Sequence, residues 1–229
     1  MRQRDWEKEK AIHILELVRS ELYMDMPHFL TALNTLMFKE DERVSVCATN
    51  GIYFYYNPLK VIELFQKNSI FLNRAYLHSI LHCLYSHIWL RKNRIEFIWN
   101  VACDIVVEYT LDSMHKKSVS RILSYARKDV YHQIEKLDGL SCITVYEWLC
   151  IRDDIQNLYY EFVVDDHASW PKEKDEKHLN RLRYKRSGKV LPNRQYLIIN
   201  KKVKRMTMGM LFLYRGYRQK NRSIHFHNF

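Results

Sequence analysis

One segment of the sequence, from about residue 72 to residue 91, is apolar on nearly every side when it is drawn as a helix. A helix without a polar face belongs in the centre of a domain rather than on its surface. Any polar side chain on such a helix has lost its water, and it is costly unless it finds a partner in the protein. The polar residues of this segment are therefore candidates for a functional site.

Two histidines of this segment, His78 and His82, are four residues apart. At about 100° per residue they lie about 40° apart on the helix, close enough for both imidazoles to reach one ion. Such a pair also occurs where each ring is hydrogen-bonded to a backbone carbonyl, and the pair alone favours that simpler interpretation. His87 lies about 180° from His78 on a regular helix, which makes it a poor third ligand.

A better third ligand stands on the next predicted helix, at about residues 97–114. Asp104 and Glu108 are four residues apart there, so both project from one side of a strongly apolar helix. Two buried carboxylates need compensation, and a metal shared with His78 and His82 would supply it. Asp104 would be the oxygen ligand, and Glu108 would orient a histidine or a water. With this pair, the sequence favours metal binding and histidines hydrogen-bonded to backbone carbonyls about equally.

The remaining pattern predicts an α+β, mainly α domain. Two β-branched or aromatic runs within residues 44–58 flank Asn50 and Gly51, a pair suited to the positive φ angles of a tight turn, and this predicts a short β-hairpin. Apolar residues at helical spacing predict helices at about residues 6–24, 27–38, 58–67, 72–91, 97–114, 116–136 and 143–151.

The cysteine pattern and the lengths of the hydrophobic segments indicate the cellular compartment. Five cysteines form no CxxC pair and their number is odd, so neither a disulfide framework nor a cysteine-rich zinc site is expected. Cys83 and Cys103 are predicted to pack in the core, and His115 and His132 to lie at the surface. No run of 18 or more apolar residues occurs, and the N-terminal residues are charged. We therefore expect a cytoplasmic protein that does not engage a membrane.

The net charge of +11 belongs to the C-terminal part of the chain. Residues 172–229 hold 17 Lys and Arg against 3 Asp and Glu, whereas residues 1–171 hold 20 against 23. This shift predicts one domain over residues 1–171 and a basic C-terminal extension over residues 172–229. A basic extension with interspersed tyrosines can bind nucleic acid or an acidic protein partner, which is the alternative function.

Four stretches of the chain, residues 48–58, 76–87, 99–104 and 165–170, occur in the order found in a known family. They resemble the metallopeptidase domain that commonly precedes a VWA-like domain in bacterial proteins, and the resemblance covers about residues 10–171. It implies a zincin-like helical fold with a short β-hairpin and a zinc ion held by His78, His82 and Asp104. It also implies that His167 approaches the site. A peptide or protein substrate and a MoxR-type AAA+ ATPase partner follow from the same resemblance.

Two departures from the family pattern change the expected activity. The glutamate of the HExxH motif is Ser79 here, and a serine hydroxyl cannot take a proton from metal-bound water as a carboxylate does. We therefore expect a hydrolase-like protein that is weak or inactive as a peptidase, unless Glu108 reaches that water as the base. The second departure is that residues 172–229 lack the DxSxS motif of a VWA domain.

Overall fold

The structure, a computed structural model, describes residues 3–171. This part is 64% helical and contains one small three-stranded sheet, so the prediction of a mainly α, α+β fold is confirmed. The basic extension and the domain boundary predicted for it lie outside the described residues. The α-helices and strands are α1 (Gln3–Asp25), α2 (Leu30–Leu33), β1 (Met37–Glu40), β2 (Cys47–Thr49), β3 (Tyr53–Tyr56), α3 (Pro58–Lys67), α4 (Ser69–Leu84), α5 (Glu96–Ser113), α6 (Tyr125–Ile134), α7 (Cys142–Leu149) and α8 (Ile155–Phe162).

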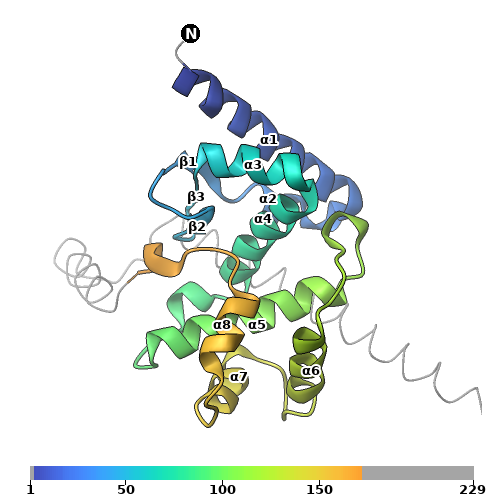
Figure 1. The fold of residues 1–229 in the computed structure, drawn as a ribbon, viewed down its shortest axis with the longest axis vertical. Coiled ribbons are helices and arrows are strands. Elements are labelled where there is room, and N and C mark those ends of the chain that lie inside the picture. The colour runs from blue at the N-terminus through green and yellow to red at the C-terminus, as the bar shows by residue number, and fades with distance from the viewer. Residues whose placement is uncertain (1–2, 172–229) are drawn as a thin grey trace, which may run out of the picture. The chain divides into compact units, whose positions relative to one another are not determined.

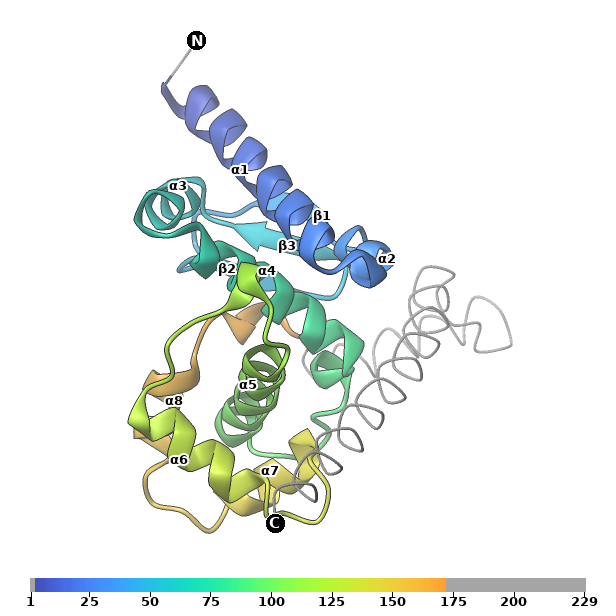
Figure 2. The same cartoon turned by 90° about the vertical axis from the view of Figure 1, so that its right-hand side faces the viewer.

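Helix α4 connects the two halves of the described domain (Figures 1 and 2). In one half it contacts α1 and α3, which lie beside the sheet, and in the other half it contacts α5. Helices α7 and α8 pack on α5 in that second half. Every residue of α4 from Leu72 to Leu84 is buried, as expected for a helix that is apolar on all sides. Its polar side chains therefore depend on partners within the protein.

The predicted hairpin is present, with β2 antiparallel to β3 and Thr49 opposite Phe54. The Asn50 side chain closes the turn by accepting hydrogen bonds from the backbone N–H groups of the two residues that follow Gly51. Of these turn residues, Gly51 alone has a positive φ, at 84°. Strand β1 adds to the other edge of β3 in parallel, which gives the order β1-β3-β2.

The prediction of a helix over residues 27–38 is wrong after Leu33, where α2 ends. A short 3-10 helix (Pro27–Phe29) leads into the single turn of α2, and β1 then begins at Met37. Side chains of Asn34 and Thr35 donate to backbone carbonyls one turn earlier, a local bond that competes with continued helix. In the strand, Phe38 packs edge-on against Phe54 in the neighbouring strand, an aromatic contact that a helix would not make.

The histidine helix ends seven residues before its predicted end. Helix α4 stops at Leu84, and Ser86 adopts a left-handed conformation with φ 61°. This bend starts a 3-10 helix (His87–Trp89) and turns His87 back toward His82. The helix predicted at residues 116–136 is also shorter, because a 3-10 turn (Lys117–Val119) and a linker precede α6. Helix α8 was not predicted.

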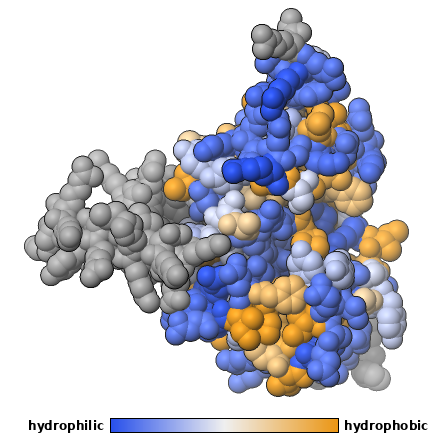
Figure 3. Space-filling model, turned by 60° about the vertical axis from the view of Figure 1, so that its left-hand side comes forward, coloured by the Kyte–Doolittle hydropathy of each residue, from blue (hydrophilic) through white to orange (hydrophobic). Residues whose placement is uncertain are grey.

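The surface of the described domain carries scattered apolar side chains. Exposed examples in the half that contains α5 to α8 are Ile95, Ile151 and Tyr160. Figure 3 shows one face of the molecule, where apolar side chains gather in the lower part of the view. Within residues 3–171, no helix combines the length and apolarity that crossing a membrane requires.

Gly51 provides a test of how tightly the hairpin is packed. A Cβ at this residue would lie 2.6 Å from Cζ2 of Trp89, and the φ angle is unfavourable for any residue with a Cβ. We expect Gly51→Ala to lower the free energy of unfolding by about 2–4 kcal/mol, measured by urea denaturation. Gly139 is a matched control because it has a φ of 81° and no atom within 4 Å of its added Cβ. Equal losses in the two variants would contradict the proposed clash.

Candidate metal centre

The structure brings the three predicted ligands together at the middle of α4. His78 and His82 are fully buried, and their Nε2 atoms lie 2.8 Å apart. Asp104 comes from the facing surface of α5, and its Oδ1 lies 3.4 Å from Nε2 of His78 and 3.2 Å from Nε2 of His82. The four-residue spacing on α4 therefore produces the convergence that the sequence predicted.

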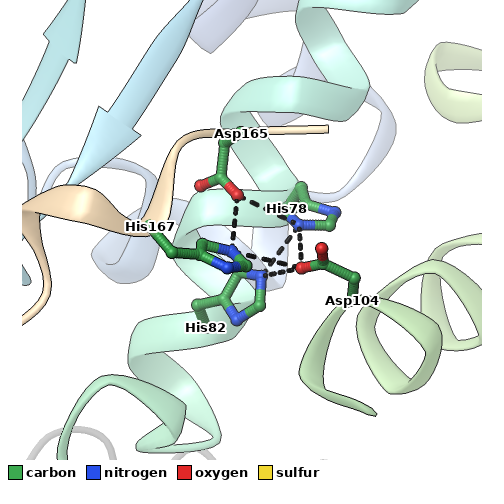
Figure 4. Close-up of side chains that lie close together, drawn as sticks. All are labelled: His78, His82, Asp104, Asp165 and His167. Atoms are coloured by element: carbon green, nitrogen blue, oxygen red, sulfur yellow. Dashed lines mark hydrogen bonds and ion pairs between the residues drawn. The ribbon is translucent and has the colours of Figure 1, made fainter. Parts of the chain in front are cut away.

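Two further donors come from the segment that follows α8. This segment lies beside β2, where the N–H of Asp166 donates to the carbonyl of Cys47 and Asp166 forms a parallel bridge with Ala48. Alternate residues of an extended segment point to the same side, so Asp165 and His167 both face the histidines of α4 (Figure 4). An approach of His167 was expected from the resemblance. Asp165 was not singled out, although its two-residue spacing from His167 within the motif at residues 165–170 was an available signal.

These five side chains form one compact donor group. Nε2 of His167 lies 3.0 Å from Oδ1 of Asp165 and 3.2 Å from Oδ1 of Asp104, and the donor atoms of all five residues lie within 4.8 Å of one another. A tetrahedral ion with bonds of about 2.0–2.1 Å places its donors roughly 3.3 Å apart. The carboxylate-to-imidazole separations of 3.0–3.4 Å lie near this value, whereas the two Nε2 atoms on α4, at 2.8 Å, are closer together.

The hydrogen bonding of the group also fits a cation. Among the described residues, Oδ1 of Asp104, Oδ1 of Asp165 and Nε2 of His167 are buried atoms that make ion-pair contacts with one another but no hydrogen bond of good geometry. Buried polar atoms in native proteins are nearly always satisfied, and an ion is one way to satisfy them. The three atoms point into the same small space (Figure 4). A divalent metal there would complete all three at once.

The charges of the group depend on one another. Burial favours the neutral imidazole of His167, but the carboxylates of Asp104 and Asp165 outweigh it and raise its pKa to about 10. Burial and the neighbouring His78 lower the pKa of His82 to about 3. The pKa of Asp165 stays well below its usual range because His167 and His78 overcome the effect of burial. Without an ion, protons on the imidazoles therefore balance the buried carboxylates.

Glu108 lies outside the five-residue group but contacts it. Its Oε1 accepts a hydrogen bond from Nδ1 of His78 at 2.9 Å, which leaves Nε2 of that ring facing the other donors. Its Oε2 lies within 3.1 Å of the guanidinium groups of Arg74, Arg121 and Arg127. Burial opposes the charged form, yet His78 and the arginines hold the pKa of Glu108 below its usual range. This arrangement suits the predicted orienting role and offers no oxygen for a general base.

Ser79, the residue at the position of the family glutamate, points to Asp165. Its Oγ donates a hydrogen bond to Oδ2 of that carboxylate at 2.8 Å, and both side chains are buried. The other oxygen of Asp165 faces the donor group. Ser79 therefore positions a candidate ligand, and its hydroxyl cannot act as the general base for a bound water as a carboxylate does.

The other histidines and cysteines singled out in the sequence lie outside the five-residue group. His87 is outside the five-residue group, and its Nδ1 lies 3.1 Å from Nδ1 of His82. Cys83 and Cys103 are buried free thiols in the core. His115 and His132 are exposed.

Fold and site together define a metallopeptidase-like domain with a buried histidine and aspartate group that could hold a divalent metal. The chain belongs to the family described as "Putative metallopeptidase domain", whose model matches residues 12–162. Three of the five donors lie within the matched residues, whereas Asp165 and His167 follow them. No curated protein and no solved structure shows a significant match to the chain.

Proposed function

We propose that this protein is a zincin-like, metal-binding domain that holds a zinc ion and has weak or no peptidase activity. The observation that carries the proposal is the convergence of three buried atoms without a well-formed hydrogen bond, from Asp104, Asp165 and His167, on the two histidines of α4. Three imidazoles and two carboxylates suit a divalent transition metal of the zinc type better than magnesium or calcium, which prefer oxygen donors alone.

Elemental analysis of the purified protein tests the metal. We expect about one zinc ion per chain at this centre, retained through gel filtration, because a buried site with four or five protein donors releases its ion slowly. Protein stripped with a chelator should regain the ion on reloading. A chain that is purified without a transition metal and cannot be loaded with zinc, cobalt or manganese would contradict the proposal.

Two features support low hydrolytic activity. Ser79 supplies no general base, and both oxygens of Glu108 are already engaged. A catalytic zinc site usually has three protein ligands and one open position for water, whereas five protein donors surround this one. We expect the zinc-loaded protein to leave an unfolded protein substrate uncut over a day. Cleavage that depends on the metal and disappears in Glu108→Gln would contradict this part of the proposal.

Proton competition gives the metal affinity a predictable pH dependence. The raised pKa values of His78 and His167 mean that the metal-free protein holds protons on these rings at pH 7, and an ion must displace them. Affinity should therefore rise with pH, by about tenfold per pH unit for each proton displaced, until the pKa of His167 is passed. Competition with a chelator of known affinity at pH 6, 7 and 8 measures the slope. An affinity that is constant over this range would contradict proton displacement.

The basic extension supports a second candidate function. Residues 172–229 hold 17 basic against 3 acidic residues, a balance that favours binding to nucleic acid or to an acidic protein. Binding of the full chain to a nucleic acid should weaken steeply with salt, and a shortened chain ending at Trp170 should lose it. Equal affinity in the two chains would remove the extension from consideration.

The family membership also motivates a proposed partnership. In this proposal, a MoxR-type AAA+ ATPase acts together with this chain on a peptide or protein substrate. Co-purification of the chain with such an ATPase, tested in both directions with tagged proteins, would support the partnership. Failure of two folded, purified proteins to associate with ATP present would count against it.

A further inference from the structure

A second cluster of potential metal ligands lies beside the first. His87 stands at the bend after α4, Cys103 is on α5, and Cys142 is the first residue of α7. All three residues are buried, and one donor atom from each lies within 4.8 Å of the others. The chain thus brings two thiols and an imidazole from three separate elements to one point in the interior.

The chemistry of this cluster differs from that of the five-residue group. Two sulfur donors and one imidazole favour a thiophilic cation such as Zn²⁺, whereas the neighbouring centre has no sulfur donor. Cys142 stands at the N-terminus of α7, where the backbone N–H groups favour a thiolate over a thiol. Three protein donors leave one position of a tetrahedral ion for a water or another small ligand.

The imidazole distinguishes a metal site from a simple pair of buried thiols. Two adjacent cysteines alone would fit a disulfide or core packing equally well. Here the strained bend at Ser86 directs His87 inward, and a hydrogen bond to His82 fixes the orientation of its ring. We propose that His87, Cys103 and Cys142 form a second, thiolate-containing metal site that binds Zn²⁺ or a similarly thiophilic ion.

Cobalt spectroscopy tests this proposal separately from the proposed function. Because the five-residue group contains no sulfur, a thiolate-to-cobalt charge-transfer band cannot come from the first centre. We expect this band when metal-free protein is titrated with Co²⁺ under anaerobic conditions. The band should remain in His78→Ala, which impairs only the first centre, so the two proposals can fail independently.

Three cysteine variants locate the band. Cys142→Ser and Cys103→Ser should each reduce its intensity at least about tenfold, since a serine hydroxyl is a poor ligand for a thiophilic ion. Cys83→Ser is the matched control, because Cys83 is also a buried free thiol but lies outside the cluster. It should leave the band unchanged. No band in the wild-type protein, or a full band in Cys142→Ser, would overturn the proposal.

A measurement on the wild-type protein covers the case in which a variant does not fold. Zn²⁺ should slow the alkylation of Cys103 and Cys142 by iodoacetamide at least about tenfold, read by mass spectrometry, because a metal-bound sulfur is a weaker nucleophile. Exposed Cys150 serves as the internal control and should react at an unchanged rate. Unaltered alkylation of Cys103 and Cys142, or a disulfide between them in zinc-loaded protein, would overturn the proposal.

Discussion

The variant His82→Ala is expected to lose nearly all metal binding at the five-residue centre. His82 contributes the Nε2 that lies 2.8 Å from His78 and 3.2 Å from Asp104, so its removal opens one side of the donor group. A structural zinc site contributes about 10–16 kcal/mol, and dividing this among five donors gives about 2–3 kcal/mol for each. We therefore expect an affinity about a hundredfold weaker, measured by competition with a chelator.

The control for this experiment is His132→Ala. His132 is exposed on α6 and takes no part in the donor group, so its variant should bind zinc as the wild type does. Thermal unfolding with and without zinc gives a second readout. Zinc should raise the melting temperature of the wild type and of His132→Ala, and it should leave His82→Ala nearly unchanged. Undiminished zinc affinity in His82→Ala would refute the placement of the ion.

The variant Ser79→Glu restores the HExxH motif in the sequence. We nevertheless expect it to destabilise the metal-free protein and to have no peptidase activity. The Ser79 hydroxyl donates to Asp165 at 2.8 Å in a buried environment. A carboxylate there would replace a donor with a like charge and would leave one oxygen of Asp165 without its partner. An uncompensated buried charge costs about 3–5 kcal/mol, a large share of the stability of a domain of this size.

Ser79→Ala is the comparison for this prediction. It removes the hydrogen bond without adding a charge, so we expect it to lose only about 1.5–3 kcal/mol. Urea denaturation of the two metal-free variants measures the difference, and a protease assay on the zinc-loaded proteins measures activity. A Ser79→Glu protein with wild-type stability and metal-dependent cleavage would show that the site accepts a general base at this position.

The core of the site could be predicted because its signals are local. Helix α4 is apolar on all sides, and this determined its central place and the burial of His78 and His82. The four-residue spacing in α4 and the position of Asp104 in α5 then predicted their convergence. The hairpin was likewise encoded locally, by Asn50 and Gly51 between two apolar runs.

The parts that sequence reasoning missed depend on contacts between distant segments. Strand β1 exists because it pairs with β3, so helical spacing in residues 27–38 was misleading. Asp165 reaches the centre only because its segment lies beside β2, far away in the chain. The left-handed conformation of Ser86 directs His87 inward. Glycine is the usual sequence signal for this conformation, and no glycine stands here.

The contact between Nδ1 of His82 and Nδ1 of His87, at 3.1 Å, couples the tautomers of the two imidazole rings. A neutral imidazole carries one hydrogen, so one of the two Nδ1 atoms must donate while the other accepts. When His82 binds an ion through Nε2, its hydrogen stands on Nδ1, and His87 must keep its own on Nε2. That tautomer denies His87 a free lone pair for a second cation. Filling both sites at once therefore requires this bond to open, so that each ring can carry its hydrogen on Nδ1 and bind an ion through Nε2.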